Sequence, residues 1–229
     1  HKGQALFIVP GGTPGLELVR KLDKLGCRAS HTAELKFNGV RIPGANLLGG
    51  LDKLEHKLAK AREAEKTGIR GRSATLGALE QTRPMVAAQA LGIARASLEY
   101  ATRYANEREA FGSPIIDNQG IAFPLADLAM RIDAARLLTW RASWMAATGV
   151  AFERGEGSMA KLAATEVAVA STERAIQTMG GWGYITDHPV EKWYRDAKLY
   201  TIFEGTSEIQ RVVISNAIAQ QDGAPPLHV

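Results

Sequence analysis

One acidic residue has surroundings that suit proton transfer. Glu204 follows the mostly apolar and aromatic run 200–203, and it precedes Gly205 and a polar stretch at 206–208. Such neighbours partly remove water from a carboxylate, a condition under which a glutamate can act as a general base near neutral pH. The same position also suits a purely structural acid, because the dipole of a helix that begins just after it favours negative charge. The residues alone therefore leave two interpretations of Glu204, a catalytic base or an acidic residue at a helix start.

Other catalytic patterns are missing from the sequence. It holds no His/Cys cluster with metal-ligand spacing, no Glu-x-x-His pair and no Gly-x-Ser-x-Gly motif, so we expect no metal site and no nucleophilic serine of that type. Gly180, Gly181 and Gly183 form a Gly-Gly-x-Gly run, but they follow a helical pattern rather than a strand, which argues against a dinucleotide-binding Rossmann turn. We interpret these glycines as positions where the backbone approaches a ligand or another chain closely.

The segments that must position these residues are mainly helical in the second part of the chain. Ala87, Leu91, Ala94 and Leu98 mark one apolar face of a first long helix, and similar spacing recurs further along. We expect long helices over about 73–108, 118–148 and 158–179, a short helix after Pro189 and a last helix over about 207–219. Three long helices and at least one shorter one predict a mainly α fold, an antiparallel bundle of the four-helix type.

Local signals refine the ends of these helices. Gly180 and Gly181 are a natural C-terminal stop for the third long helix. Pro124 lies in the early turns of the second long helix and should kink it or delay its start. Ser207 and Gln210 have the spacing of a capping box, so we expect Ser207 to cap the last helix.

Residues 4–50 have the character of β structure rather than of helix. The run 5–9 is a strand candidate that ends in turn formers at 10–15, and 33–40 alternates apolar and polar residues like a half-buried strand. The few strands of this part cannot form a closed sheet alone. We therefore expect a partial β-domain that packs on something else or whose partner strands are missing from the chain.

The chain therefore divides into four parts: a partial β-domain at 1–50, a charged linker or insertion at 51–73, a helical bundle domain at 74–221 and a frayed tail at 222–229. Within the charged part, Leu51, Leu54 and Leu58 have helical spacing, whereas 68–72 has the composition of a mobile linker. A solvated surface insertion accounts for this part, and a partner surface is the alternative.

Composition favours an ordinary globular protein. The 229 residues are 45% hydrophobic, and no apolar run reaches the roughly 18 residues of a membrane span, so we expect no membrane insertion. The single cysteine, Cys27, leaves no internal disulfide and suits a reducing compartment, the cytoplasm or, in a eukaryote, the mitochondrial matrix. Much of the basic excess lies in the stretch 53–72, which contains no aromatic residue, so we expect no nucleic-acid partner.

Five motifs, in the right order along the chain, resemble those of the acyl-CoA dehydrogenases. Gln-Thr-Met-Gly-Gly-Trp-Gly-Tyr-Ile-Thr-Asp at 177–187, followed by Lys192, Arg195 and Asp196, is similar to the family's C-terminal signature. Phe-Glu-Gly-Thr-Ser at 203–207 resembles its catalytic-glutamate turn, and Glu-Gln-Thr-Arg-Pro at 80–84 resembles the start of its first C-terminal helix. The stretches 106–112 and 118–119 resemble its flavin-contacting loop. The resemblance covers roughly residues 4–50 and 74–215.

The resemblance implies an FAD enzyme that introduces a trans double bond between Cα and Cβ of an acyl-CoA thioester. Glu204 would remove the pro-R α-proton, a hydride from Cβ would pass to the flavin, and the electrons would leave to an electron-transferring flavoprotein. Some members of the family carry the base on the first bundle helix, but the matching position here is Thr82, which cannot serve as a base. The resemblance therefore favours the catalytic interpretation of Glu204.

The resemblance also implies roles for other positions. Glu80 and Arg83 would position the CoA part of the substrate, although capping and salt bridging at the helix start explain them equally well. Arg108 would bind pyrophosphate, with a surface pairing to Glu107 or Glu109 as the alternative. Contacts to the FAD of a neighbouring subunit would come from Arg108, Glu109, Ala110, Phe111, Gln119, Gln177, Gly180 and Gly181, and contacts beside Glu204 from Gly205, Thr206, Ser207 and Glu208. Binding across subunits implies a homo-oligomer, a dimer or a tetramer.

Two other functions stay open at the level of the sequence. An acyl-CoA oxidase uses the same base and flavin but passes electrons to oxygen. Because the resemblance leaves out the family's N-terminal helical domain and the first half of its β-domain, the chain could also be a non-catalytic assembly subunit or fragment, including one within a hetero-oligomer.

Overall fold

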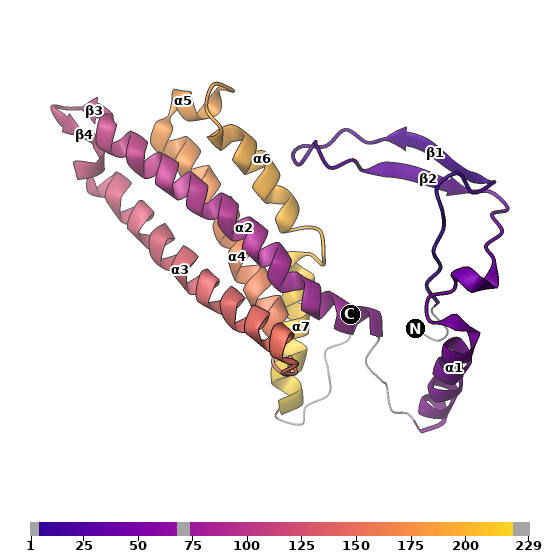
Figure 1. The fold of residues 1–229 in the computed structure, drawn as a ribbon. Helices are drawn as coiled ribbons and strands as arrows, with labels where there is room; N and C mark the ends of the chain where they lie inside the picture. The colour runs from indigo at the N-terminus through magenta and orange to yellow at the C-terminus, as the bar shows by residue number, and fades with distance from the viewer. Residues whose placement is uncertain (1–4, 68–73, 222–229) are drawn as a thin grey trace. The chain divides into compact units, whose positions relative to one another are not determined.

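The computed structural model describes residues 5–67 and 74–221 (Figure 1). The chain forms two compact units, the first comprising His1–Lys24 and Arg28–Gly77 and the second comprising Leu25–Cys27 and Ala78–Val229. The linker expected at 68–72 and the tail expected at 222–229 lie outside the described residues.

The N-terminal unit is built around one antiparallel strand pair. β1 (Leu16–Lys21) pairs with β2 (Ala33–Phe37), with an irregular register between Leu18 and Arg20. Gly15 precedes β1 with a φ of +85°, and a Cβ there would lie 2.2 Å from the Asn38 carbonyl oxygen, so glycine is required for this close approach. A short 3-10 helix, η1 (Gly44–Asn46), and the charged helix α1 (Gly50–Thr67) follow.

The prediction of a strand at 5–9 is wrong, and β1 lies outside the predicted strands. The Ile8 N–H donates to the Asn46 carbonyl over 2.9 Å, and Phe7 forms an isolated bridge with Leu47, so this segment meets only a short stretch of chain. A strand needs a partner of matching length, and an apolar run does not show whether one exists. β2 ends at Phe37, earlier than predicted, and the following turn places Gly39 at a φ of +61°.

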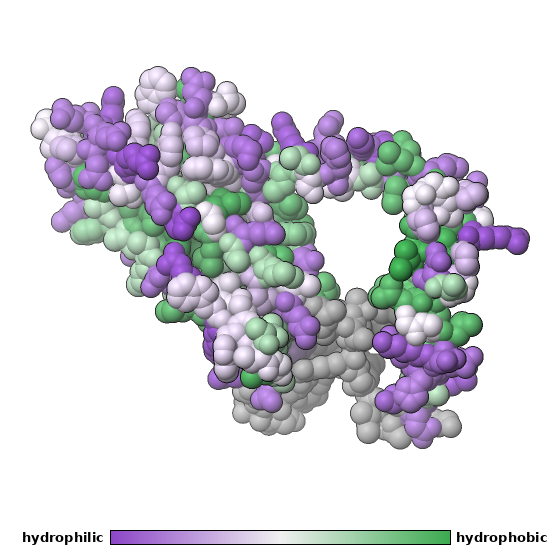
Figure 2. Space-filling view, in the orientation of Figure 1, coloured by the Kyte–Doolittle hydropathy of each residue, from purple (hydrophilic) through white to green (hydrophobic). Residues whose placement is uncertain are grey.

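The strand pair leaves large apolar side chains exposed. Every residue of β2 is exposed, including Leu35 at 52% and Phe37 at 58%, and Figure 2 shows hydrophobic residues gathered over this unit. A two-stranded ribbon of this kind is at best marginally stable in water. This exposure is what a partial β-domain would show, since such a domain needs a further surface to cover its apolar side.

The second unit is an antiparallel bundle of long helices, as predicted from the apolar periodicity. Its main elements are α2 (Ala74–Glu107), α3 (Gln119–Thr148), α4 (Glu156–Met179), α6 (Val190–Tyr200) and α7 (Ser207–Gln221). The connections hold the short elements β3 (Glu109–Ala110), β4 (Ser113–Pro114), η2 (Ile115–Asp117) and α5 (Gly181–Tyr184). Figure 1 shows α2, α3 and α4 running side by side. The mainly α fold class is therefore confirmed.

Small side chains let these helices approach one another closely. Ala87 and Ala94 on α2 and Ala164 on α4 are completely buried in one core cluster, which Leu128 and Ile132 of α3 complete. Burial of each such branched side chain contributes about 1.5–3 kcal/mol. The bundle thereby fixes the start of α2, the middle of α4 and the chain before α7 in one place. None of the described helices is both long and apolar enough to cross a membrane.

Two helix starts bear on the predictions. α3 begins at Gln119, close to the predicted start, so of the two effects expected of Pro124 the delayed start is not found; the proline ring removes one N–H donor from the helix. At α7 the capping hydroxyl belongs to Thr206, whose Oγ1 accepts a hydrogen bond from the Ile209 N–H over 3.4 Å. Ser207 is already inside the helix, and its Oγ is buried without a hydrogen-bond partner among the described residues. The cap therefore lies one residue earlier than the capping-box pattern predicts.

Part of the C-terminal signature fixes an N-terminal segment on α6. The Cys27 N–H donates to Asp196 Oδ1 over 2.6 Å, and the Leu25 carbonyl accepts a hydrogen bond from Arg195 over 3.0 Å. Gly26 lies between them, and a Cβ there would lie 2.3 Å from the Arg195 carbonyl oxygen. Burial raises the pKa of Asp196, but the hydrogen bonds from Lys192 and the Cys27 N–H outweigh it and lower that pKa below its usual value.

Candidate active site

Glu204 lies in the loop between α6 and α7 and has a backbone conformation that is rare for its residue type. Its φ is +56°, and Gly205 follows with a φ of +91°. Among the described residues other than glycine, only Cys27, Phe111 and Glu204 have positive φ. This conformation costs a residue with a side chain about 1–3 kcal/mol and persists only where surrounding contacts enforce it. The contacts around Glu204 must therefore maintain this conformation.

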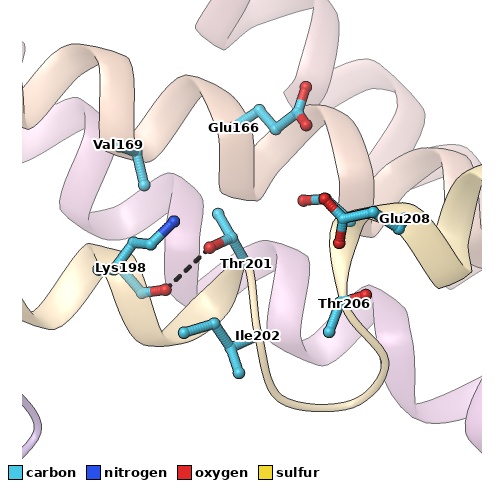
Figure 3. Close-up of a pocket in the computed structure, with 8 residues that line it drawn as sticks. Glu166, Val169, Lys198, Thr201, Ile202, Thr206 and Glu208 are labelled. Atoms are coloured by element: carbon cyan, nitrogen blue, oxygen red, sulfur yellow. Dashed lines mark hydrogen bonds between the residues drawn. The ribbon is translucent and has the colours of Figure 1, made fainter.

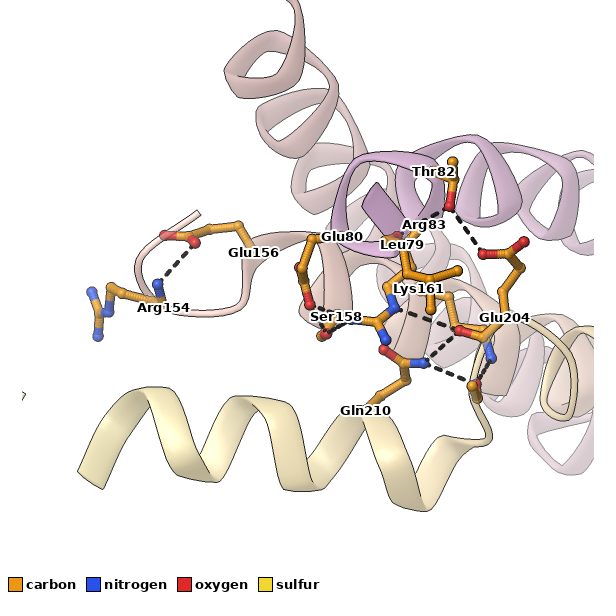
Figure 4. Close-up of polar contacts among 11 residues, drawn as sticks. Leu79, Glu80, Thr82, Arg83, Arg154, Glu156, Ser158, Lys161, Glu204 and Gln210 are labelled. Atoms are coloured by element: carbon orange, nitrogen blue, oxygen red, sulfur yellow. Dashed lines mark hydrogen bonds and ion pairs between the residues drawn. The ribbon is translucent and has the colours of Figure 1, made fainter. Parts of the chain in front are cut away.

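One oxygen of the Glu204 carboxylate is held by a hydroxyl from the first bundle helix. Thr82 Oγ1 donates to Glu204 Oε2 over 2.9 Å (Figure 4). The Glu204 side chain is half-buried, and within the described chain no hydrogen bond reaches its other oxygen, Oε1. Thr82 cannot act as a base, but it orients the residue that can. The carboxylate thus has a fixed direction and one oxygen that is available to a ligand.

Three buried polar side chains bind the two carbonyl oxygens of this turn (Figure 4). Gln210 Nε2 donates to the Glu204 carbonyl over 3.1 Å and to the Gly205 carbonyl over 2.8 Å. Lys161 Nζ donates to the Gly205 carbonyl over 2.7 Å, and Arg83 Nε reaches the Glu204 carbonyl at 3.5 Å. Arg83, Lys161 and Gln210 are the largest fully buried side chains that the structure describes. We call these three residues the carbonyl clamp.

The carbonyl clamp draws one residue from each of three helices. Arg83 comes from α2, Lys161 from α4 and Gln210 from α7. Packing of the bundle therefore enforces the strained turn, because the three donors reach the Glu204 and Gly205 carbonyls only when the helices are assembled. Space is tight there: a Cβ on Gly205 would lie 2.7 Å from Gln210 Nε2.

The carbonyl clamp also places positive charge close to Glu204. Burial is the main cause that lowers the pKa of Lys161 to about 8, and the Arg83 guanidinium acts in the same direction. The carboxylates of Glu204 and Glu208 oppose this change. Within the described residues Lys161 forms no ion pair, so its charge is balanced only by these neighbours and by the Gly205 carbonyl.

The predicted substrate residues Glu80 and Arg83 contact each other and Ser158. Arg83 Nη1 forms an ion pair with Glu80 Oε1 and donates to Ser158 Oγ over 2.8 Å, and that hydroxyl donates to Glu80 Oε1 over 2.6 Å. Gly157 makes room for this network, since a Cβ there would lie 2.4 Å from the Glu80 carbonyl oxygen. The salt bridge considered as an alternative from the sequence therefore exists. Contact of Glu80 or Arg83 with CoA stays a prediction.

A pocket of about 320 Å³ opens beside the start of α7 (Figure 3). Its lining residues come from α4, α6, α7 and the loop before α7: Glu166, Val169, Lys198, Thr201, Ile202, Thr206, Ser207 and Glu208. Hydrogen bonds from its own backbone N–H and from the Thr206 hydroxyl lower the pKa of Glu208. Three residues predicted to contact the cofactor, Thr206, Ser207 and Glu208, thus line one pocket, and Gly205 precedes them in the turn.

Other predicted cofactor residues lie on a hairpin that follows α2. Glu109 and Ala110 form β3, which pairs with β4, and the tip consists of Phe111 and Gly112 with φ of +59° and +89°. The Phe111 side chain projects completely into solvent. Arg108 is exposed as well, and the structure shows no ion pair of this arginine within the described residues, so the pairing with a neighbouring glutamate is not found. An exposed aromatic ring at the tip and an exposed guanidinium at the base of this hairpin suit contact with another molecule.

The glycine turn predicted to contact the cofactor follows α4. Nothing lies within 4 Å of the position of a Cβ on Gly180 or Gly181, so these two glycines border open space. Thr178 Oγ1 is buried nearby without a hydrogen-bond partner among the described residues, and Gln177 is exposed. Gly183 differs, because a Cβ there would lie 2.7 Å from the Ile176 carbonyl oxygen. The interpretation as a close approach to a ligand or another chain thus fits Gly180 and Gly181, whereas Gly183 packs inside the bundle.

The structure does not bring these groups of residues together within one chain. The η2 segment that follows the hairpin, the start of α3 and the end of α4 share an apolar cluster that contains Ala105, Leu125 and Met179. Glu204 and the carbonyl clamp lie near the opposite end of α2. About 24 helical residues separate Arg83 from the end of α2, which corresponds to roughly 36 Å at 1.5 Å per residue.

Several residues of the site escaped the sequence-based prediction, above all Lys161. A usable signal exists, since Lys161 follows Gly157 by four residues and precedes Ala164 by three, which places it on the buried face of α4. A lysine on such a face indicates a specific partner inside the protein. The spacing of Gln210 indicates a capping box, whereas its side chain binds the turn, and the sequence around Ser158 has no pattern that singles it out.

The fold and the site together define a helical-bundle domain that holds Glu204 in a strained turn, and the residues that follow this turn line a pocket at the start of α7. The chain belongs to the acyl-CoA dehydrogenase family, because residues 70–219 match the family model described as "Acyl-CoA dehydrogenase, C-terminal domain".

Named relatives agree with this assignment. The chain is 47% identical over 215 residues to the mitochondrial short-chain specific acyl-CoA dehydrogenase of Rattus norvegicus, with 94% of this chain and 48% of that protein covered. It is 44% identical over 213 residues to an acyl-CoA dehydrogenase of Bacillus subtilis, with 93% and 52% covered. The structure of butyryl-CoA dehydrogenase from Megasphaera elsdenii superposes with a TM-score of 0.79 at 39% identity, covering 93% of this chain and 51% of that one. The chain thus spans about half the length of the relatives it matches.

Proposed function

We propose that the chain carries the catalytic base of an FAD-dependent acyl-CoA dehydrogenase, which converts an acyl-CoA thioester into the trans-2-enoyl-CoA. The observation that carries this proposal is the left-handed turn at Glu204, with both of its carbonyl oxygens bound by the carbonyl clamp. Backbone strain that buried side chains maintain is typical of a functional site. The names of the relatives and the motif at 203–207 support the same reaction.

In this reaction Glu204 takes the proton from the carbon next to the thioester carbonyl. That proton is weakly acidic, so the base must be held accurately against it. Thr82 fixes one carboxylate oxygen, which leaves Oε1 to accept the proton. The carbonyl clamp prevents the turn from relaxing to an unstrained conformation that would aim the carboxylate elsewhere.

The residues present fit a bound flavin dinucleotide. Thr206 and Ser207 line the pocket at the start of α7, and the buried Ser207 hydroxyl has no hydrogen-bond partner among the described residues. At the other end of the bundle, Gly180 and Gly181 border open space, and the exposed Arg108 guanidinium suits a pyrophosphate. Bound FAD would accept the hydride from Cβ, a redox step that no protein side chain supplies.

A homo-oligomer follows from the separation of the two sets of residues. One FAD could contact both only if a neighbouring copy brings its hairpin and glycine turn to the Glu204 end of this chain, as a dimer or tetramer would allow. A related subunit in a hetero-oligomer could supply the same contacts. An electron-transferring flavoprotein would accept the electrons, in the cytoplasm or in the mitochondrial matrix of a eukaryote.

Anaerobic titration with an acyl-CoA tests the proposed function. Protein supplied with FAD should show a visible flavin band that bleaches when butyryl-CoA is added, and free CoA should leave the band unchanged. Recovery of the band upon addition of an electron-transferring flavoprotein would identify the acceptor. A band that no acyl-CoA bleaches would contradict the proposal, whereas rapid oxygen consumption without an added acceptor would assign the oxidase reaction instead.

A further inference from the structure

Lys161 is the one member of the carbonyl clamp whose charge forms no ion pair within the described residues. Gln210 is neutral, and Arg83 is paired with Glu80. The Lys161 side chain is nevertheless completely buried, and its Nζ donates to the Gly205 carbonyl over 2.7 Å. Burial of a charge without an ion pair is unfavourable, and an apolar side chain of similar volume would pack there without that penalty. The lysine therefore calls for a role other than packing.

We propose that Lys161 is a positioning residue for the base: its ammonium binds the Gly205 carbonyl and so holds the left-handed turn that aims the Glu204 carboxylate at the substrate. Lys161 acts through the backbone, since its hydrogen bond is to Gly205 and not to the carboxylate. The consequence for catalysis rests on the proposed function, whereas the contact and its effect on the turn do not.

The charged groups around Lys161 make its protonation state observable. Arg83 on α2 repels its charge, while Glu204 in the loop and Glu208 on α7 attract it, and together with burial these groups set its pKa at about 8. Loss of the proton turns a strong, charge-assisted donor into a weaker neutral one. The electronic environment of the Gly205 carbonyl should therefore change as Lys161 titrates.

Selective isotope labelling isolates this carbonyl. A glycine precedes a threonine at only two places in the sequence, 12–13 and 205–206. Protein labelled with ¹³C at glycine carbonyls and ¹⁵N at threonine should therefore give two correlation peaks, with Gly12 as an internal control. We expect the Gly205 peak to move with a midpoint near pH 8 in the unmodified protein, and to be independent of pH in Lys161→Met. The Gly12 peak should not move in either protein.

A matched pair of variants separates charge from hydrogen bonding. Lys161→Gln keeps a donor without a charge, so its Gly205 peak should lie nearer the high-pH position of the unmodified protein and should not titrate. If the proposed function holds, Lys161→Met should slow flavin bleaching at saturating acyl-CoA about 10- to 100-fold, because a misplaced base loses rate rather than affinity. The acyl-CoA concentration for half-saturation should change less than about threefold, and Lys161→Gln should recover part of the rate.

Two results would overturn the inference. The first is a Gly205 peak that moves with pH in Lys161→Met as it does in the unmodified protein. The second is a Gly205 peak that lies at the same position in both proteins at every pH. If Lys161→Met does not fold, Lys161→Gln provides the test. A Gly205 peak that still moves with pH in Lys161→Gln would show that another group causes the titration. The spectrum of the Gly205 carbonyl can be recorded without turnover. If acyl-CoA never bleaches the flavin band, that result counts against the proposed function, and the test of the contact between Lys161 and Gly205 stays valid.

Discussion

At the scale of single residues, the turn at Glu204 and Gly205 links backbone strain to the direction of one carboxylate. A left-handed glutamate is unfavourable by itself, yet here its carbonyl and the next one receive hydrogen bonds from three buried side chains. Thr82 then fixes the side chain that this backbone presents. Direction and strain therefore depend on the same small set of contacts, and a change in any of them should affect both.

Gly205 is the residue of this turn least able to accept a side chain. We expect Gly205→Ala to lower the free energy of unfolding by about 1–3 kcal/mol, because its φ is +91° and the new Cβ would lie 2.7 Å from Gln210 Nε2. Urea unfolding measures the change. Gly181→Ala is the matched control, since nothing lies within 4 Å of its Cβ position and stability should change by less than about 0.5 kcal/mol. Equal stability of the two variants would show that the turn is not strained as described.

At the scale of elements, the start of α7 supports the turn by an arrangement that differs from the predicted capping box. The hydroxyl of Thr206 caps the helix, while the hydroxyl of Ser207 is buried without a partner in the described chain. This difference decides which of two adjacent hydroxyls stabilises the helix.

Removing the two hydroxyls in turn should therefore give different results. We expect Thr206→Ala to lower the free energy of unfolding by about 1 kcal/mol, the usual effect of losing a cap. Ser207→Ala should leave stability unchanged or slightly raised, because no hydrogen bond is lost in the protein alone. Thermal or urea unfolding of both variants measures this. A larger loss in Ser207→Ala would restore Ser207 as the cap.

The long helices could be predicted from the sequence because each carries its own apolar periodicity, as Leu125, Leu128 and Ile132 do on α3. The strands could not, since β1 is defined by its pairing with β2 and the run 5–9 has no partner of its own length. The same distinction between local and long-range features applies to the candidate site. The neighbours of Glu204 and the motif around it are local, whereas the approach of Lys161 to Gly205 joins residues 44 positions apart and becomes visible only in the folded chain.

At the scale of the whole molecule, the buried ammonium of Lys161 makes the stability of the bundle depend on pH. The pKa of Lys161 is about 8 in the folded protein and 10.5, its ordinary value, in the unfolded chain. Between these two pH values the unfolded chain therefore binds more protons than the folded protein. The penalty of burying the charge is fully present below about pH 8, and it is relieved as pH rises toward the unfolded value. A pKa difference of this size corresponds to at most about 3 kcal/mol, and solvent screening reduces it to about 1–2 kcal/mol.

We therefore expect the free energy of unfolding of the unmodified protein to rise relative to that of Lys161→Met as pH increases above 8. We expect a rise of about 1–2 kcal/mol, and urea unfolding at a fixed protein concentration, from neutral to alkaline pH, measures it. Subtracting the variant removes the contributions of other titrating groups. A difference that stays constant with pH would show that Lys161 keeps its ordinary pKa in the folded state.

The most direct test of the account is the rate of flavin bleaching in Glu204→Gln, measured by rapid anaerobic mixing with butyryl-CoA. The amide keeps the size of the side chain and an oxygen that can accept the Thr82 hydrogen bond, but it cannot take a proton. We predict that the variant binds FAD as the unmodified protein does and bleaches at least about a thousandfold more slowly. An undiminished rate in Glu204→Gln would contradict the account, because the α-proton would then be leaving to another group.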